Sequence, residues 1–490
     1  MKKLVEIYEN NTMVPYDKRK MLCIIGIDIR NAFNSLRWKD IIRELKKQKV
    51  PDYLIAVMQN YLQDRYVESG ELVFETTAGS FQGSVIGPLL WNIVYDPIVR
   101  SKTSPHAEKL AYADDMLKVL ITQNKETLLQ DSENITKQTK KKLKKRGLSM
   151  ENSKTESLIL EGRKVDRADA KISVDGEILD VGTTLKYLGF NLNKGLNMSH
   201  HLKIACEKTK AVTNHFRSIL PNIDGPTFLK RRLIIHAILS ILWYGIEIWA
   251  TSCNRKKNTN LITTTIRPLK RSLSSAYKTV SNNVLNVITD LPPTDLLIEK
   301  RLRTIKKSED KVEIEIDINR RWNQRWMEEG MENKDKWLHK LLPSLQPWIE
   351  RSHGDVDFYL SQFFSGHGSF NSYLHRFKLV PSPLCPLCLS APDTPEHTFF
   401  GCTHIEGNKK ELETKLDTDI SPTNIINLML NSTENWELIK TYITKIIKNK
   451  IATNNSLNSQ STPTLSVAAG EKSPNRDDSG IIRADTQPGV

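Results

Sequence analysis

The sequence has few cysteines, no long apolar run and no repeat of fixed period. Six cysteines in 490 residues are too few and too scattered to build a disulfide-linked fold. The start of the chain carries no secretory signal, since Met1-Lys2-Lys3 leads into mixed polar sequence. The most apolar segment, residues 233–250, contains His236 and Glu247 and is about the minimum length that spans a bilayer. We therefore expect a buried amphipathic helix there, and a soluble intracellular protein without a membrane partner.

Positive charge is in excess. Lysine and arginine outnumber aspartate and glutamate by 71 to 57, which gives a net charge of +14. Such an excess favours a polyanionic partner, most simply nucleic acid, although ribosomal, chromatin and membrane-surface proteins share it. With 39% hydrophobic residues, the chain can bury two or three cores at roughly 100–200 residues per domain.

Stretches of different texture follow one another along the chain. Residues 1–20 are polar, and residues 21–192 alternate short apolar runs with amphipathic ones, which predicts strands and helices in one α+β domain over residues 1–192. Residues 193–350 are helical in pattern, basic and rich in tryptophan, residues 351–415 contain a cysteine cluster, and residues 416–450 are again helical. Residues 451–490 are rich in Ser, Thr, Asn and Pro, which predicts disorder. The expected strands are 22–28, 109–113, 116–120 and 157–160, and the expected helices are 38–47, 51–62, 87–99 and 125–146.

Three aspartates stand where apolar segments end. Asp28 closes one strand-like run, and Asp114 and Asp115 lie in Tyr112-Ala-Asp-Asp115 with apolar runs on both sides. An acidic pair inside an apolar hairpin is costly to bury unless a cation compensates it. An isolated Asp-Asp pair is more often a turn or a helix cap. Here the order along the chain is a strand that ends in aspartate, a glycine-rich turn and the apolar-flanked acidic pair. This order favours a pocket for two Mg²⁺ ions that serve nucleotidyl transfer.

In this order the segments resemble the motifs of the reverse-transcriptase palm. Motif A corresponds to Asp28-Ile-Arg-Asn-Ala-Phe33, motif B to Phe81-Gln-Gly-Ser-Val-Ile-Gly-Pro-Leu-Leu90 and motif C to Tyr112-Ala-Asp-Asp115. Motif D matches Gly147 to Thr155, and motif E, the primer grip, matches Tyr187-Leu-Gly-Phe190. The resemblance implies a right-hand polymerase of α+β class. Its palm would span residues 1–192, followed by a helical thumb over 193–350 and a small zinc knuckle within 351–415.

The resemblance assigns roles residue by residue. Asp28, Asp114 and Asp115 would hold the two Mg²⁺ ions, with Asp115 the secondary ligand. Phe33 stands where the family places the side chain that stacks under the sugar and excludes a 2′-hydroxyl, so we expect a DNA product. Viral RNA polymerases usually carry aspartate at the position of Phe33 and glycine at the position of Ala113, which argues against that family.

Other residues would bind the substrates. Gln82 and Gly83 would line the nucleotide and template pocket, Gly83 because a side chain there would obstruct close approach. Lys154 would lie near the pyrophosphate as a charge stabiliser or proton donor, or else be a solvated surface lysine. The implied partners are an RNA template, a DNA primer or target, and deoxynucleoside triphosphates.

A metal site is expected nearer the C-terminus. Cys385-x2-Cys388-x8-His397-x4-Cys402 offers three thiolates and one imidazole, a set that favours a structural, tetrahedral Zn²⁺. Chance cysteines in a core are the alternative. The spacing resembles the C-terminal knuckle of non-LTR retrotransposons. Residues 362–376 resemble the region before that knuckle in arthropod elements that insert into ribosomal DNA. No mechanism for His367 follows from the sequence.

Clusters of cations and aromatics are candidates for nucleic-acid contacts. Basic side chains would grip phosphates and exposed tryptophans could stack on unpaired bases, although we expect most of these tryptophans in the core of a helical thumb. The first basic run is alternatively a solvated helix face or a nuclear-localisation patch. The basic runs are 140–146, 255–257, 300–307 and 320–321, and the tryptophans are Trp322, Trp326, Trp337 and Trp348.

Two hypotheses follow for the chain as a whole. In the family a longer fingers region precedes motif A and an endonuclease domain lies further upstream, whereas only 27 residues precede Asp28. In the first hypothesis, the chain is part of the RNA-directed DNA polymerase of a non-LTR retrotransposon and acts by target-primed reverse transcription. It would work in the nucleus, where the family's chromosomal target lies, or otherwise be cytoplasmic. The second is a truncated, catalytically inactive remnant that only binds nucleic acid.

Overall fold

The structure is a computed structural model, and it describes residues 1–80, 83–101, 106–161, 169–307, 309–332 and 336–460. The chain divides into two compact units, Met1–Ser361 and Gln362–Val490. The boundary between the units therefore falls slightly later than residue 350, where the sequence pattern had suggested one.

A four-stranded antiparallel sheet lies in the first part of the first unit. Its strands, in spatial order, are β4 (Ala107–Tyr112), β5 (Asp115–Thr122), β1 (Met21–Arg30) and β6 (Ser149–Glu161). β1 is apolar along most of its length because both of its faces are covered. Leu22 and Ile24 enter one core, whereas Cys23, Ile25 and Ile27 enter the other.

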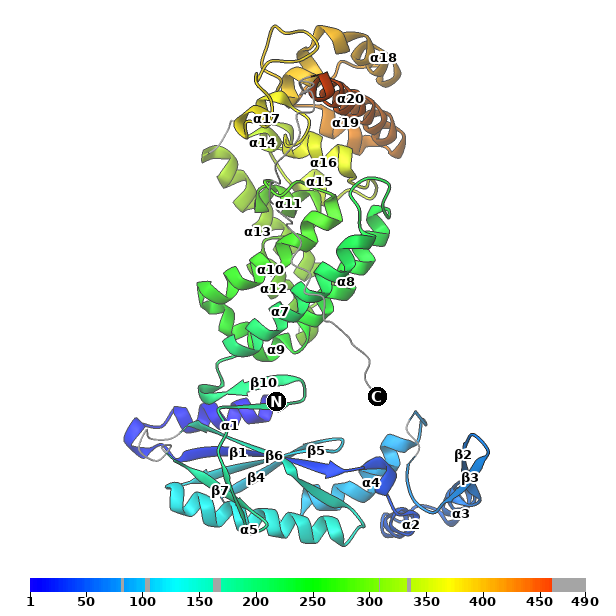
Figure 1. Cartoon of the computed structure of the whole chain (residues 1–490), viewed down its shortest axis with the longest axis vertical. Coiled ribbons are helices and arrows are strands. Elements are labelled where there is room, and N and C mark those ends of the chain that lie inside the picture. The colour runs from blue at the N-terminus through cyan, green and yellow to red at the C-terminus, as the bar shows by residue number, and fades with distance from the viewer. Residues whose placement is uncertain (81–82, 102–105, 162–168, 308, 333–335, 461–490) are drawn as a thin grey trace, which may run out of the picture. The chain divides into compact units, whose positions relative to one another are not determined.

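Helices cover both faces of this sheet, with α1 on one side and α5 on the other (Figure 1). α1 (Lys2–Thr12) and several helices from later in the unit pack against the face of Leu22 and Ile24. Four helices pack against the other face: α2 (Trp38–Lys47), α3 (Asp52–Leu62), α4 (Gly87–Arg100) and α5 (Lys125–Lys144). The helices predicted from the sequence are thus confirmed, because amphipathic spacing marks their buried sides.

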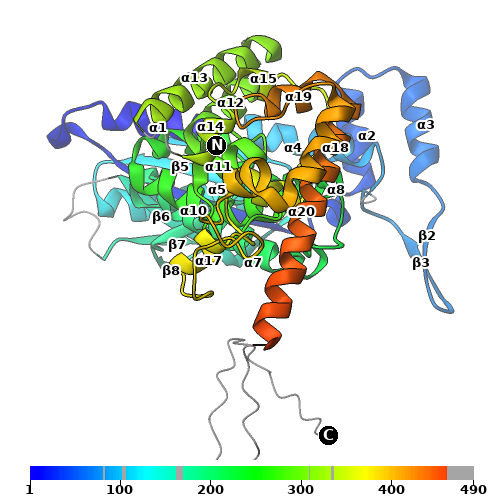
Figure 2. The ribbon, with the colours of Figure 1, turned by 90° about the horizontal axis from the view of Figure 1, so that it is seen from above.

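Three two-stranded hairpins were not expected from the sequence. They are β2 (Arg65–Ser69) with β3 (Leu72–Thr76), β7 (Lys171–Val174) with β8 (Glu177–Asp180), and β9 (Thr184–Tyr187) with β10 (Phe190–Asn193). The β2–β3 hairpin stands out from the neighbouring ribbon (Figure 2). Its Tyr66, Val73 and Phe74 are each more than half exposed, so no alternation of buried and exposed residues marks its strands.

Helices make up the rest of the first unit. They are α7 (Ser199–Phe216), α8 (Phe228–Trp243), α9 (Ile246–Trp249), α10 (Lys256–Ser274), α11 (Asn282–Ile288), α12 (Thr294–Lys306), α13 (Lys311–Glu332), α14 (Trp337–Leu341), α15 (Gln346–Ile349) and α16 (Phe358–Ser365), which crosses into the second unit. The short 3-10 turns of the unit are η1 (Tyr16–Lys18), η2 (Phe33–Ser35), η3 (Lys194–Leu196), η4 (Arg217–Ile219) and η5 (Ala250–Asn254).

The apolar segment of residues 233–250 forms two helices rather than one. α8 ends at Trp243, and α9 begins after Gly245, whose φ of +63° breaks the helical path. α8 buries Ile238 and Leu242 but leaves Leu229 63% and Leu233 75% exposed. One side of the helix is thus buried, but the polar outer face expected of an amphipathic helix is not found, because leucines also occupy the exposed side. No single described helix is long and apolar enough to cross a membrane. Only together would α8 and residues 246–254 be long and apolar enough, and their helix axes are bent by 49° relative to each other.

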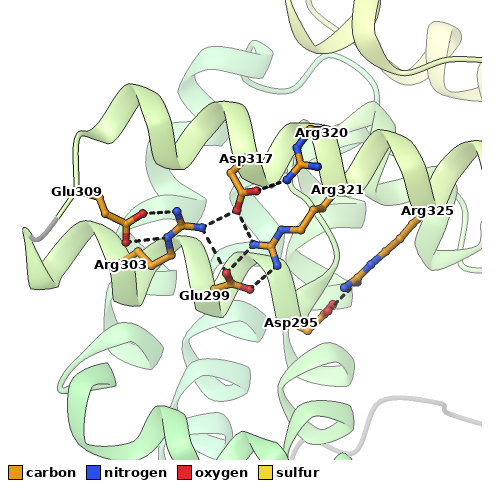
Figure 3. A network of polar contacts seen from close by, with 8 residues as sticks. All are labelled: Asp295, Glu299, Arg303, Glu309, Asp317, Arg320, Arg321 and Arg325. Carbon is orange, nitrogen blue, oxygen red and sulfur yellow. Dashed lines mark hydrogen bonds and ion pairs between the residues drawn. The ribbon is translucent and has the colours of Figure 1, made fainter.

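Ion pairs join α12 to α13 (Figure 3). Arg303 contacts Glu299, Glu309 and Asp317, the last at 2.7 Å, and Arg321 contacts Glu299 at 2.5 Å and Asp317 at 3.1 Å. The sequence had suggested that these arginines grip phosphates. Carboxylates of the same unit thus already pair with Arg303 and Arg321, whereas phosphate contacts by the basic runs 300–307 and 320–321 stay a prediction.

The tryptophans of this region belong mostly to the core, as expected. Trp322, Trp326 and Trp348 are each at most 5% exposed. The indole nitrogen of Trp326 donates to the carbonyl of Leu342 at 2.8 Å, and that of Trp348 donates to the carbonyl of Val287 at 2.9 Å. Their buried polar atoms are therefore satisfied inside the protein, and these rings are not free to stack on bases.

The second unit is helical around a cysteine-rich loop. Its elements after α16 are α17 (Asn371–Arg376), a π-helical turn η6 (His397–Gly401), η7 (Thr403–Ile405), α18 (Glu406–Leu416), α19 (Ile425–Asn431) and α20 (Thr433–Gln460). α20 continues past Lys450, where disorder was expected to begin. Residues 451–460 contain no Pro or Gly to end the helix, which explains the correction. The remaining predicted tail, residues 461–490, lies outside the described residues.

Candidate active site and metal centre

The three aspartates come together because two neighbouring strands bring them to one end of the sheet. The ladder between β1 and β5 runs antiparallel up to the pair Ile27 and Met116, so Asp28 and Asp115 each stand one residue beyond it. Asp114 occupies the two-residue loop between β4 and β5, next to Asp115. Residues that are far apart in the chain thus meet at one end of the β1–β5 ladder. Asp28 does not end its strand as expected, because β1 continues to Arg30 and Asp28 pairs with Glu151 on β6.

The loop that carries Asp114 is conformationally special. Ala113 has a φ of +51°, in the left-handed region that costs a residue with a Cβ atom. The indole nitrogen of Trp91 on α4 donates to the carbonyl of Ala113 at 2.9 Å, which helps to hold the loop in this conformation. Sequence reasoning missed Trp91, because nothing in the local pattern links it to a loop 22 residues away.

Negative charge accumulates at this edge. Partial burial, and then the charges of Asp114 and Asp28, raise the pKa of Asp115. Burial and Asp115 raise the pKa of Tyr187 to about 12, and burial followed by Asp114 raises that of Tyr95. The carboxylates therefore lie close enough to repel one another and to affect neighbouring phenols.

One cation faces the aspartates. The ammonium of Lys154 on β6 lies 3.5 Å from Oδ2 of Asp28, and the Lys154 side chain is 69% exposed. An ion pair this exposed adds little stability, and the lysine is free to move. The sequence left Lys154 open between a site residue and a surface lysine, and the structure places it beside the site.

Phe33 lies next to the start of motif B. Its ring centroid is 5.1 Å from that of Trp91, and its carbonyl accepts a hydrogen bond from the amide of Ser80 at 2.8 Å. Gly83 has a φ of +85°, and a Cβ there would meet nothing within 4 Å. Its backbone conformation, rather than close packing inside the protein, accounts for the glycine. Gln82 lies outside the described residues.

Motif E forms the tight turn between β9 and β10. Leu188 and Gly189 have φ values of +48° and +76°, the pair of positive angles found in type I′ hairpin turns. The hydroxyl of Tyr244, at the end of α8, donates to the carbonyl of Leu188 at 2.8 Å. A residue of the helical region therefore holds the turn, a contact over 56 positions that the sequence did not reveal.

The predicted metal ligands of the second unit meet in space. One ligand atom from each of Cys385, Cys388, His397 and Cys402 lies within 4.8 Å of all the others. Sγ of Cys385 is 3.9 Å from Sγ of Cys402, close to the roughly 3.8 Å edge of a tetrahedron with metal–sulfur bonds of about 2.3 Å. Sγ of Cys388 is 3.2 Å from Nε2 of His397. The π-helical turn η6 carries His397 and leads directly into Cys402.

The thiols of this cluster differ in their environments. Two hydrogen bonds from Ser390, one from its hydroxyl and one from its amide, lower the pKa of Cys388 to about 6. Burial raises the pKa of Cys385 to about 11. A thiolate is therefore already favoured at Cys388, whereas Cys385 needs a bound cation to ionise at neutral pH.

Residues 4–192 match the family described as reverse transcriptase (RNA-dependent DNA polymerase). Residues 4–192 are a reverse transcriptase domain. It contains the β1–β5 edge with its three aspartates, Lys154, Phe33 and the motif E turn. The mixed helix-and-sheet fold expected from the sequence is confirmed for this domain.

The relatives of the chain come from arthropod retrotransposons. It is 22% identical over 386 residues to a 115 kDa protein in the type-1 retrotransposable element R1DM of Drosophila melanogaster, covering 73% of this chain and 37% of the relative. It is 20% identical to the retrovirus-related Pol polyprotein of the type-1 element R1 of Bradysia coprophila, covering 79% of this chain and 41% of the relative. It is 21% identical to the Pol polyprotein of the type-1 element R1 2 of Nasonia vitripennis, covering 67% of this chain and 86% of the relative. These similarities support a non-LTR reverse transcriptase of the R1 type. The chain spans less than half the length of the first two relatives.

Solved structures resemble the reverse transcriptase chain only distantly. A telomerase from Candida albicans, in complex with a TWJ fragment of telomeric RNA, has a TM-score of 0.34 and 11% sequence identity. The match covers 67% of this chain and 51% of the telomerase. A telomerase from Candida tropicalis without RNA has a TM-score of 0.33 and 14% identity, covering 64% and 55%.

A buried ion pair, which sequence reasoning also missed, supports the cysteine loop. Asp393 lies between Cys388 and His397 and is fully buried, and both of its oxygens accept from the ammonium of Lys450 at 2.6 Å. The amide of Asn371 donates to the same carboxylate at 2.7 Å. The available signal was the spacing of α20, since Lys450 continues the buried series of Ile439, Ile443, Ile446 and Ile447.

Proposed function

We propose that the chain is the polymerase portion of a non-LTR retrotransposon Pol protein, and that it copies RNA into DNA by target-primed reverse transcription. The observation that carries the proposal is the meeting of Asp28, Asp114 and Asp115 at one edge of the sheet of a reverse transcriptase domain. Burial and the charges of Asp114 and Asp28 raise the pKa of Asp115, so this site needs a counter-charge, which supports a divalent-cation site.

The residues at this edge fit Mg²⁺. Carboxylate oxygens are its preferred protein ligands, and it usually binds one or two of them together with substrate phosphates. Asp28, Asp114 and Asp115 would hold two ions, with Asp115, the most exposed of the three, in the secondary role. When bound, a Mg²⁺ pair lowers the pKa of the primer 3′-hydroxyl and offsets negative charge on the leaving pyrophosphate.

The chain's own side chains would orient the other reactants. The Phe33 ring, held against Trp91, would pack under the deoxyribose and leave no room for a 2′-hydroxyl. Lys154 is only weakly tied to Asp28, so it would turn toward the triphosphate and donate to the pyrophosphate oxygens. Gln82 and Gly83 would border the incoming nucleotide and the template base.

The remaining regions would bind nucleic acid and a structural metal. We assign residues 193–350 as the thumb, because Tyr244 holds the motif E turn where a primer terminus would rest. The cluster of Cys385, Cys388, His397 and Cys402 fits Zn²⁺ in ligand type and spacing. The partners would be an RNA template, a DNA primer and deoxynucleoside triphosphates, and the place of action the nucleus.

Primer extension tests this function. The full chain, with oligo(dT) on poly(rA), Mg²⁺ and dTTP, should incorporate dTMP, and Asp114→Ala/Asp115→Ala should abolish incorporation. Asp96→Ala, which removes a surface carboxylate paired with Arg100, is the matched control and should retain activity. Incorporation no greater than that of the double variant would contradict catalysis by this chain. Salt-sensitive RNA binding retained in that case would favour the inactive, nucleic-acid-binding remnant instead.

A further inference from the structure

A cavity in the helical part of the first unit has two arginines among its lining residues. It has a volume of about 220 Å³ and lies between the end of α7 with η4 and the last turns of α10. Among the described residues that line it, none is acidic. The lining residues are Arg217, Leu220, Pro221, Asn222, Arg271, Ser272 and Ala276.

The two arginines of this cavity have no partners in the described part of the chain. Neither Arg217 nor Arg271 forms an ion pair or a side-chain hydrogen bond there, and Nε of Arg271 is buried without an acceptor. Burial, and then the charges of Arg217 and Arg267, lower the pKa of Arg271. Arg271 is thus partly desolvated beside the exposed Arg217, with no counter-charge among the described residues, and an entering anion would stabilise this arrangement.

An ordinary role for the arginines would be to neutralise helix ends, since both lie near the C-termini of α7 and α10. Arg231 already fills that role. It is only 4% exposed, and its guanidinium donates to the carbonyls of Leu220 at 3.4 Å, Ser272 at 2.9 Å and Pro226 at 2.8 Å, and also to that of Pro221. Arg231 therefore already engages four backbone carbonyls beside the cavity, and the side chains of Arg217 and Arg271 form no hydrogen bonds with the described residues.

We propose that this cavity binds one phosphate group of a nucleic-acid strand, held jointly by Arg217 and Arg271. The guanidinium fork matches the oxygens of a phosphate in a way that an ammonium does not. Asn222 at the rim supplies an amide that can donate to the same group. The inference rests on the proposed function only in taking nucleic acid as the source of the phosphate.

Salt-dependent binding tests the proposal. Anisotropy of a 3′-labelled single-stranded oligo(dT) would be measured with the full chain over a range of salt concentrations, without Mg²⁺ or nucleotides. Each phosphate contact contributes about 0.7 to the slope of log K against log salt for a single strand. Arg217→Gln, Arg271→Gln and the double variant should each reduce the slope by about 0.7. The double variant should lose no more than either single one, because both arginines hold one phosphate.

Control variants separate this effect from lost charge and lost fold. Arg320→Gln removes one positive charge that Asp317 already neutralises at 2.8 Å, and it should leave the slope unchanged. Arg271→Lys keeps the charge without the fork, so it should keep the slope but bind about tenfold more weakly. A 5′-phosphorylated strand and a 5′-hydroxyl strand would also be compared. If the phosphorylated strand binds more tightly, and only when both arginines are present, the bound group is a terminal phosphate. Equal binding of the two strands would identify an internal phosphodiester.

Three results would overturn the proposal. The first is that Arg217→Gln and Arg271→Gln each have the same salt-dependence slope as the parent. The second is that the double variant loses the sum of the two single losses in slope. The third is that the parent does not bind the strand at low salt. The additive loss would mean two separate surface contacts. Since the assay requires no polymerisation, an inactive chain can still show the predicted slope change. An active chain with unchanged slopes would refute this site while leaving the polymerase function intact.

Discussion

Replacing Lys450 with methionine should destabilise the second unit strongly, although the two side chains are similar in size. Lys450 is 2% exposed and Asp393 is fully buried, and the ammonium donates to both carboxylate oxygens at 2.6 Å. Lys450→Met leaves the carboxylate of Asp393 in the interior with only the amide of Asn371 and the hydroxyl of Thr398 as donors. Removing one partner of a buried ion pair typically costs about 3–5 kcal/mol.

Hydrogen exchange measures this cost locally. A loss of about 3 kcal/mol or more should speed amide exchange in the protected part of α20 at least about a hundredfold, since each 1.4 kcal/mol is roughly a factor of ten. Lys445→Met is the matched control, because Lys445 is 54% exposed and lies 4.0 Å from Glu411. That control should cost about 0–1 kcal/mol.

A second variant separates the buried charge from the lost packing. Asp393→Asn/Lys450→Met carries no uncompensated charge and should recover part of the protection. Equal exchange in Lys450→Met and Lys445→Met would refute the reasoning. So would a double variant that exchanges as fast as Lys450→Met alone.

Three further predictions concern the nucleotide site, the cysteine cluster and the ion pairs of Figure 3. Phe33→Ala should raise ribonucleotide incorporation relative to deoxynucleotide at least about tenfold in primer extension, and an unchanged ratio would contradict the sugar-exclusion role. Cys388→Ser should lower the zinc content of the purified full chain, and equal metal content would mean that the cluster is not the site. Arg303→Met should lower the melting temperature at low salt and less so at high salt, because it removes three ion pairs. Arg325→Met, which removes one exposed pair, should have a smaller effect; equal shifts would contradict cooperation in the network.

Sequence patterns predicted the strands and helices correctly where buried residues recur at regular spacing. β1 and the helix of residues 38–47 were predicted closely, because long amphipathic or apolar runs mark them. β6 begins at Ser149, well before the predicted start at residue 157. Its first half is mostly polar and only partly buried, so no apolar run marks it as a strand. The β2–β3 hairpin was missed because neither of its faces is buried.

The candidate sites divide in the same way. Ligand types and spacing predicted the cysteine cluster, and the neighbouring apolar runs predicted Asp28, Asp114 and Asp115, since local sequence carries this information. Asp28 nevertheless lies inside β1 rather than at its end. Trp91 and Tyr244 hold site loops from distant segments, and their roles depend on tertiary contacts that no local pattern encodes. The pairing of the cations on α12 and α13 also depends on how two helices meet.

Metal-directed cleavage tests most directly the claim that carboxylates from two strands share one cation site. Fe²⁺ in place of Mg²⁺, with ascorbate and peroxide, generates radicals that cut the chain beside the bound ion. With the cysteine cluster first saturated with Zn²⁺, cuts are predicted both near Asp28 and near Asp114 and Asp115. Excess Mg²⁺ should suppress these cuts, and Asp114→Ala/Asp115→Ala should abolish them. Cuts confined to other segments, or unchanged in that variant, would contradict the account.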